Sequence, residues 1–132
     1  PVGLQAVGGV VRAEARDTGD QLIGTPADHI MLTAIGRLPT MGTVQNTEIK
    51  VRADLVAKQS LVNERQDFVP TPEGYTLWGV SVDTEIGQKT PVRVGVEGHN
   101  LFDTAHREYS SLLRYFGDQP GRDVRVRVGF DF

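Results

Sequence analysis

The chain has 132 residues, about one ordinary domain's worth of sequence, so we expect a single structural unit. Its 14 basic residues are scattered among 17 acidic ones, which excludes the concentrated basic face that nucleic-acid binding needs. The absence of cysteine excludes disulfides, thiolate zinc sites and cysteine nucleophiles, and no apolar run reaches the roughly 18 residues that a membrane-spanning helix needs.

Hydrophobic residues recur every second position, which predicts about six β-strands. The first is expected near Val7 to Arg16, where Val11, Ala13 and Ala15 alternate with charged residues. The second is expected over His29 to Leu38, with a less regular pattern. Strands therefore dominate from the start of the chain.

The later strands alternate more strictly. The third places Ile49, Val51, Ala53 and Leu55 on one face and Glu48, Lys50, Arg52 and Asp54 on the other. The fourth is expected over Trp78 to Ile86 and the fifth over Val92 to His99. The sixth ends the chain and places Val124, Val126, Val128, Phe130 and Phe132 opposite Arg125, Arg127, Gly129 and Asp131. Each strand has one apolar side.

The connections alternate between short and long. Residues 38–47 and 87–91 are rich in glycine, proline and small polar residues, as tight turns require, whereas 17–28, 59–74 and 101–123 are longer. In an up-and-down meander the long connections would all lie on one rim. Transmembrane barrels show this asymmetry, with short periplasmic turns and long outer loops.

Three segments occur in the order found at the end of TonB-dependent outer-membrane receptors. They are "DFVPTPEGYTLWGVSV", "VGVEGHNLFDTAHREY" and "LLRYFGDQPGRDVRVRVGFDF", and the chain resembles that family on the strength of all three together. An earlier stretch, "DTGDQLIGTP", is similar to the family's Leu-Pro-x-x-Pro loop, with Ile23 in place of the first proline. The resemblance covers about three-quarters of the chain and is most specific toward its C-terminal end.

The resemblance implies that residues 1–132 are the C-terminal part of a transmembrane barrel of about 22 strands, with the plug domain and the earlier strands absent. It implies energy-dependent uptake of a scarce nutrient (an iron chelate, another metal complex or cobalamin) across the outer membrane of a Gram-negative bacterium. The implied partners are outer-membrane lipid, the TonB energy-coupling complex through the missing plug, and the barrel assembly machinery. No enzymatic activity, cofactor, resident metal or nucleic-acid partner is expected.

Two sets of residues follow from the resemblance as candidates. The alternating C-terminal strand, Val124, Val126, Val128, Phe130 and Phe132, is expected to be read by the assembly machinery, although Arg127 stands near the position where such signals usually carry glycine. In the last long loop, Arg107, Arg114 and Arg122 are candidates for contacting an anionic substrate such as a metal chelate.

Other residues suggest chemistry but have a plainer explanation. His29, His99 and His106 lie on different segments without the paired spacing of metal ligands. Asp103, His106, Glu108 and Ser110 include an acid, a base and a nucleophile, but in a polar loop such residues occur together by chance.

Two alternative functions stay open at this point. One is a self-contained soluble β-barrel or sandwich that binds a small ligand, because alternation alone does not say whether the apolar side faces lipid or a core. The other is an outer-membrane β-protein with a structural or adhesive role.

Overall fold

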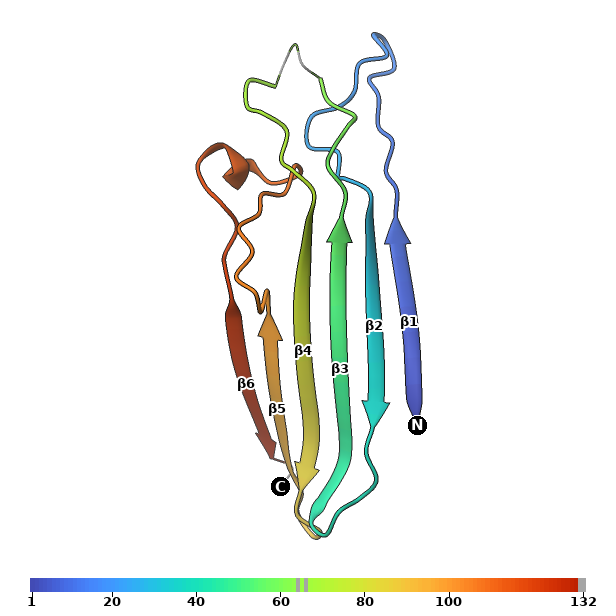
Figure 1. The fold of residues 1–132 in the computed structure, drawn as a ribbon, viewed down its shortest axis with the longest axis vertical. Coiled ribbons are helices and arrows are strands. Elements are labelled where there is room, and N and C mark those ends of the chain that lie inside the picture. Colours follow the sequence, from blue (N-terminus) through green and yellow to red (C-terminus); the bar gives the residue numbers. More distant parts are fainter. Residues whose placement is uncertain (64, 66, 131–132) are drawn as a thin grey trace.

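Antiparallel pairing between successive segments organises the chain into one sheet. A computed structural model describes residues 1–63, 65 and 67–130. In these ranges six strands lie side by side in chain order (Figure 1). They are β1 (Val2–Gly9), β2 (His29–Arg37), β3 (Val44–Val56), β4 (Tyr75–Ile86), β5 (Val92–His99) and β6 (Asp123–Phe130), and a short 3-10 helix, η1 (Leu112–Tyr115), precedes β6. The predicted all-β, antiparallel meander is confirmed.

The pairing register places the charged residues of the described strands on one face of the sheet. Directly opposed residues of an antiparallel ladder share a face, and Val51 is paired with Ala34 and Val80 whereas Lys50 is paired with Ile35 and Ser81. Among the described strand residues, one face carries no charged side chain across all five ladders; we call it the apolar face. Its larger members include Val2, Leu4, Ile30, Leu32, Ile49, Val51, Leu55, Trp78, Val80, Val82, Val94, Val96, Val124, Val126, Val128 and Phe130.

The opposite face, which we call the polar face, holds ion pairs between and along strands. Arg37 of β2 contacts Glu48 of β3 at 2.8 Å, and Arg127 of β6 reaches across β5 to Asp83 of β4 at 3.2 Å. Gly95 of β5 lies under the second pair, and a Cβ there would come within 2.6 Å of the Asp83 carboxylate. A side chain at position 95 would therefore displace the Asp83 carboxylate from its present contact with Arg127.

Among the described residues, the sheet encloses no hydrophobic core. The accessible surface is 9081 Å², against the roughly 6,800 Å² expected for a globular monomer of this mass. Ala53 and Tyr109 are the buried apolar residues of the described part, whereas Val126 and Phe130 are 66% and 64% exposed. The sheet is open, so β1 and β6 form its two edges.

The first predicted strand is wrong in its position. β1 spans Val2–Gly9, and Val11, Ala13 and Ala15 lie in the following loop, where Glu14 makes an isolated bridge with Gln21. The reason is pairing: β2 offers partners only from Gly36, opposite Val2, to His29, opposite Gly9. Alternation in one segment does not reveal where its partner strand ends.

The last strand agrees with its prediction as far as the structure describes it. Val124, Val126, Val128 and Phe130 follow one another on the apolar face of β6, opposite Gly98, Val96, Val94 and Val92 of β5. Phe132, the fifth residue of the predicted assembly strand, lies outside the described residues.

The connections alternate in length as expected. Residues 10–28, 57–74 and 100–122 lie at one end of the sheet, and the short connections 38–43 and 87–91 lie at the other (Figure 1). The short connections use Gly42 and Gly87, both with positive φ, where residues with a Cβ are strained. We refer to 10–28, 57–74 and 100–122 as the long loops.

Candidate functional site

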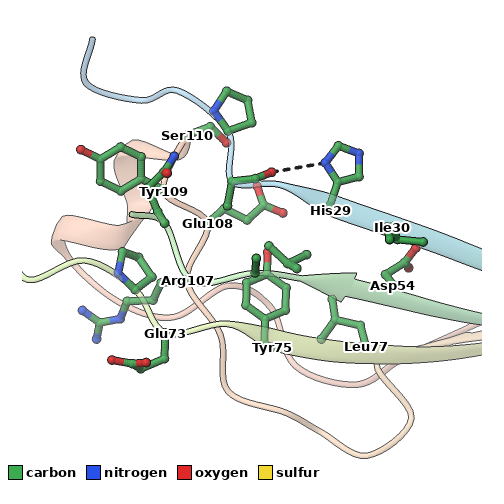
Figure 2. Close-up of a pocket in the computed structure, with 16 residues that line it drawn as sticks. His29, Ile30, Asp54, Glu73, Tyr75, Leu77, Arg107, Glu108, Tyr109 and Ser110 are labelled. Carbon is green, nitrogen blue, oxygen red and sulfur yellow. Dashed lines mark hydrogen bonds between the residues drawn. The ribbon is translucent and has the colours of Figure 1, made fainter. Parts of the chain in front are cut away.

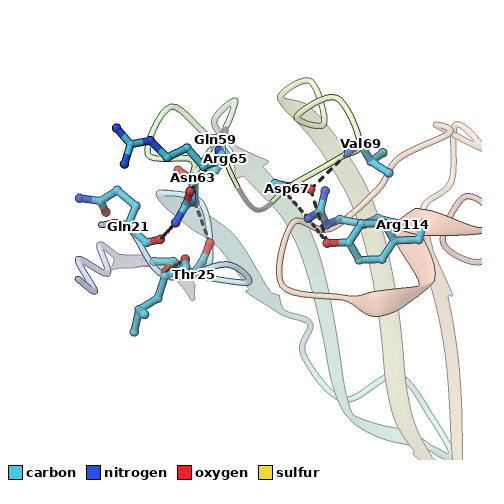
Figure 3. A network of polar contacts seen from close by, with 10 residues as sticks. Gln21, Thr25, Gln59, Asn63, Arg65, Asp67, Val69 and Arg114 are labelled. Atoms are coloured by element: carbon cyan, nitrogen blue, oxygen red, sulfur yellow. Dashed lines mark hydrogen bonds and ion pairs between the residues drawn. The ribbon is translucent and has the colours of Figure 1, made fainter. Parts of the chain in front are cut away.

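The long loops are joined to one another by polar side chains of the middle loop, 57–74. The side-chain amide of Gln59 donates to the carbonyl oxygen of Thr25 at 2.7 Å, and that of Asn63 donates to the carbonyl oxygen of Gln21 at 3.3 Å (Figure 3). Gln59 and Asn63 are each 7% exposed. Because a buried amide without partners is costly, these bonds fix loop 57–74 against loop 10–28.

A buried ion pair joins loop 57–74 to loop 100–122. Arg114, which lies in η1, donates from Nη2 to Asp67 Oδ2 at 2.7 Å, and the side chains are 1% and 5% exposed (Figure 3). The guanidinium carbon lies 4.3 Å from the ring centroids of both Tyr109 and Tyr115. The cation is thus paired with a carboxylate and lies against two aromatic rings.

A hollow of about 310 Å³ lies between the long loops and the start of the sheet (Figure 2). Strands β2, β3 and β4 contribute His29, Ile30, Asp54, Val56, Tyr75 and Leu77, and the long loops contribute Pro26, Ala27, Ala57, Gln59, Pro72, Glu73, Arg107, Glu108, Tyr109 and Ser110. Its size is at the lower end of the range for small-molecule sites. We call it the loop pocket.

Charges in the wall of the loop pocket are mostly paired. Arg107 contacts Asp118 at 2.6 Å and Glu73 contacts Lys58 at 2.6 Å, outside the pocket. Asp54 lies 3.2 Å from Arg52 on the polar face. Glu108 has no ion pair among the described residues. The pocket therefore offers hydrogen-bonding groups and carboxylate oxygens beside apolar side chains.

The three candidate substrate arginines do not share one surface. Arg114 is buried with Asp67, and Arg107 pairs with Asp118 and donates from Nη1 to the carbonyl oxygen of Arg114. Arg122 is exposed just before β6, where its backbone N–H donates to Asp103. Only Arg107 of the three lines the loop pocket. A substrate contact by these arginines stays a prediction.

The residues that suggested catalysis are not joined to one another. Asp103 accepts from the backbone of Arg122, and His106 Nδ1 lies 3.1 Å from the carbonyl oxygen of Thr104, with its ring against Tyr75. No hydrogen bond between described residues links Asp103, His106, Glu108 and Ser110 to one another. Glu108 and Ser110 lie in the wall of the loop pocket.

The three histidines lie apart. His29 begins β2, His99 ends β5 and His106 lies in loop 100–122. Within the described ranges, no group of three or more His, Cys, Asp or Glu side chains is placed to hold a metal ion. His99 instead accepts from Arg52 at Nδ1 and contacts Glu97 through Nε2.

Sequence reasoning missed the residues that organise the loops. Gln59 and Asn63 lie in a stretch with no periodicity, and Asp67 and Tyr109 occur only as members of longer motifs. The hydrogen bonds that join Gln59, Asn63 and Asp67 to the other loops span 34 to 48 residues of the chain. Local patterns carry no signal for such contacts.

Comparison with known proteins gave no match: no family model, no curated protein and no solved structure matches this chain. A search of the described part of the chain for a helix long and apolar enough to cross a membrane found none.

Proposed function

We propose that the chain is the C-terminal part of the barrel of a TonB-dependent outer-membrane transporter that takes up a scarce nutrient such as an iron chelate, another metal complex or cobalamin. The observation that carries the proposal is that every charged side chain of the described strands lies on one face of an open sheet, while the other face carries none. Such a sheet suits a barrel wall with lipid on one side and a hydrated lumen on the other.

Three further features support the proposal. The exposed apolar face has no core to cover it, which is a liability in water and an advantage in hydrocarbon. β3 and β4 have 13 and 12 residues, above the roughly 9–11 that a tilted strand needs to cross a bilayer. Long loops at one rim and short turns at the other are typical of outer-membrane barrels.

The motifs that carry the family resemblance lie at the ends of strands. Gly74 and Tyr75 stand at the start of β4, and Asn100 follows β5 in the left-handed region with φ 47°. Gly121 and Arg122 directly precede β6. Each motif therefore marks a transition between a strand and a long loop, as expected for the entry and exit points of barrel strands.

The soluble alternative lacks comparable support. A self-contained barrel or sandwich needs either closure between β1 and β6 or a second sheet, and the described residues form one open sheet. A structural or adhesive outer-membrane protein would have the same kind of barrel wall. A measurement of uptake distinguishes that alternative from a transporter.

The first test asks which face meets lipid. In the complete gene product, Val80→Cys and Ser81→Cys place a fluorescent label on the apolar and the polar face at adjacent positions of β4. We expect brominated lipid to quench the label at position 80 strongly and the label at position 81 weakly. Equal quenching at both positions would show that the apolar face does not contact the bilayer.

The second test asks about transport. The complete gene product is expressed in a Gram-negative host, and uptake of labelled ferric chelates and cobalamin is measured with and without the energy-coupling protein. Uptake of at least one of these compounds that disappears with the coupling protein is expected. Correct insertion without any coupled uptake would favour the structural or adhesive alternative.

A further inference from the structure

The contact between loops 57–74 and 100–122 is unusually well enclosed for a loop contact. Asp67 lies in a loop with no helix or strand, and Arg114 lies in a single turn of 3-10 helix, yet both side chains are almost completely shielded from water. Taking an ion pair out of water is costly unless its geometry and hydrogen bonds compensate. The surrounding groups therefore have to supply that compensation.

Aromatic side chains supply the enclosure. Tyr109 and Tyr115 both lie against the Arg114 guanidinium, and Phe68 stacks on the Tyr115 ring at 5.1 Å between centroids. The hydroxyl of Tyr115 accepts from Arg114 Nη2 at 2.7 Å and lies 3.5 Å from Asp67 Oδ1. Phe68 of loop 57–74 and Tyr109, Arg114 and Tyr115 of loop 100–122 thus form one cluster around the ion pair.

Removing either charge would leave the other buried without a partner. Such a loss is strongly destabilising, whereas an exposed ion pair contributes little. The neighbouring Arg107–Asp118 pair provides the comparison, because its side chains are 42% and 49% exposed and both belong to loop 100–122. The Asp67–Arg114 pair is consequently the contact expected to decide whether the two loops stay together.

Loop 57–74 is also bonded on its other side. Gln59 and Asn63 hold loop 10–28 through two backbone carbonyls, so the middle loop contacts both of its neighbours. The loop pocket is lined by residues of all three loops, and its wall residue Tyr109 also contacts the Arg114 guanidinium. Moving one loop alone would disturb the pocket and break buried contacts.

We propose that the Asp67–Arg114 pair is a latch that couples loops 57–74 and 100–122 beside the loop pocket, so that loosening one loop loosens the other, with loop 10–28 attached through Gln59 and Asn63. The inference concerns the loops themselves and holds whether or not the chain belongs to a transporter.

Amide hydrogen exchange in the complete gene product tests the latch with one variant in each of the two loops. Asp67→Asn alters only loop 57–74, so the informative amides are those of loop 100–122, where Arg114, Phe116 and Gln119 donate to backbone carbonyls. We expect their exchange to accelerate on the order of 100-fold, the factor that corresponds to breaking a buried pair. Unchanged exchange in loop 100–122 would overturn the proposal.

The reciprocal variant is milder and keeps the test valid if Asp67→Asn misfolds. Tyr115→Phe removes one hydroxyl from loop 100–122, and we expect exchange in loop 57–74, including the Asp67 amide that donates to Asn63, to accelerate roughly 5-fold. Asp118→Asn is the matched control, because it breaks an ion pair inside loop 100–122. Acceleration in loop 57–74 that is as large in Asp118→Asn as in Tyr115→Phe would also overturn the latch.

Discussion

At the residue scale, the protonation of Asp67 sets the pH range over which the loop latch holds. Burial alone would raise the pKa of Asp67, but hydrogen bonds from Arg114 and from the Val69 backbone N–H hold it below its ordinary value of 3.8. A carboxyl with a lowered pKa in the folded state contributes stability above its unfolded pKa and loses it as the pH falls through the folded pKa. The latch is therefore expected to be complete at neutral pH.

This gives a prediction for acid. With a spin label on Leu112→Cys, which is an exposed position in η1, label mobility should stay constant from about pH 8 to about pH 5 and rise only below about pH 4. Asp67→Asn should be mobile at every pH, because it lacks the charge. A transition centred between about pH 5 and pH 8 would mean that another group controls the loops.

Burial also affects the phenol of Tyr109, whose ring lies against the Arg114 guanidinium. Burial first, and then the nearby negative charge of Asp67, raise the pKa of Tyr109 to about 12. Because the folded pKa is raised, its contribution to stability is complete below the ordinary value of 10.0 and is lost as the pH rises toward about 12. Protonation of Asp67 is thus expected to weaken the latch at low pH, and ionisation of Tyr109 is expected to weaken it at high pH.

Two asparagines in left-handed backbone offer a matched pair of variants. Asn100 has φ 47° and is buried, and its side chain both donates to and accepts from the backbone of Thr104. Asn46 has φ 52° and an exposed side chain that donates to Glu85. Alanine at either position lacks asparagine's tolerance for the left-handed conformation. Only Asn100→Ala also removes a buried side chain that satisfies the backbone N–H and carbonyl of Thr104.

We therefore expect Asn100→Ala to reduce the local stability of loop 100–122 by about 3 kcal/mol and Asn46→Ala to reduce that of the β3 bulge in which it lies by about 1 kcal/mol. Amide exchange at Thr104, and at residues flanking Asn46, measures the two effects separately. Similar losses at both sites would show that backbone strain, and not the buried hydrogen bonds, dominates.

At the element scale, the two faces of each strand should respond differently to the same kind of substitution. Val51→Arg places a charge on the apolar face of β3, and Lys50→Arg keeps the charge on the polar face at the adjacent position. In a bilayer the first change should cost about 2–4 kcal/mol if position 51 lies near the midplane, and the second less than about 0.5 kcal/mol. Urea unfolding in lipid vesicles measures both, and equal costs would argue against a lipid-facing apolar face.

The alternation of apolar and polar residues predicts the strands because it is a property of each segment alone. It does not predict where a strand begins and ends, because the partner strand determines which residues can pair. The residues of β3, β5 and β6 repeat every two positions for eight or more residues, so their faces are readable from the sequence alone. Val11, Ala13 and Ala15 repeat as well, but β2 has no residues left to pair with them. The latch could not be predicted at all, because Asp67 and Arg114 are 47 residues apart in irregular segments.

At the scale of the whole molecule, the two open edges and the uncovered apolar face lead to the same expectation. β1 and β6 expose unpaired backbone groups, and Leu4 and Val126 on these edges are 85% and 66% exposed. A sheet with such edges recruits further strands or other copies. In a barrel those neighbours are further strands of the wall, and without them the same edges associate with one another.

The isolated polypeptide of residues 1–132 should therefore require detergent to remain dispersed. We expect it to sediment as large β-rich aggregates in aqueous buffer and as a small species in detergent micelles, because micelles cover the apolar face that the fold leaves open. Analytical ultracentrifugation with and without detergent, combined with circular dichroism, distinguishes the two states. A monodisperse β-sheet monomer in buffer alone would mean that β1 and β6 close on each other in solution, and the apolar face would then be the lining of a core.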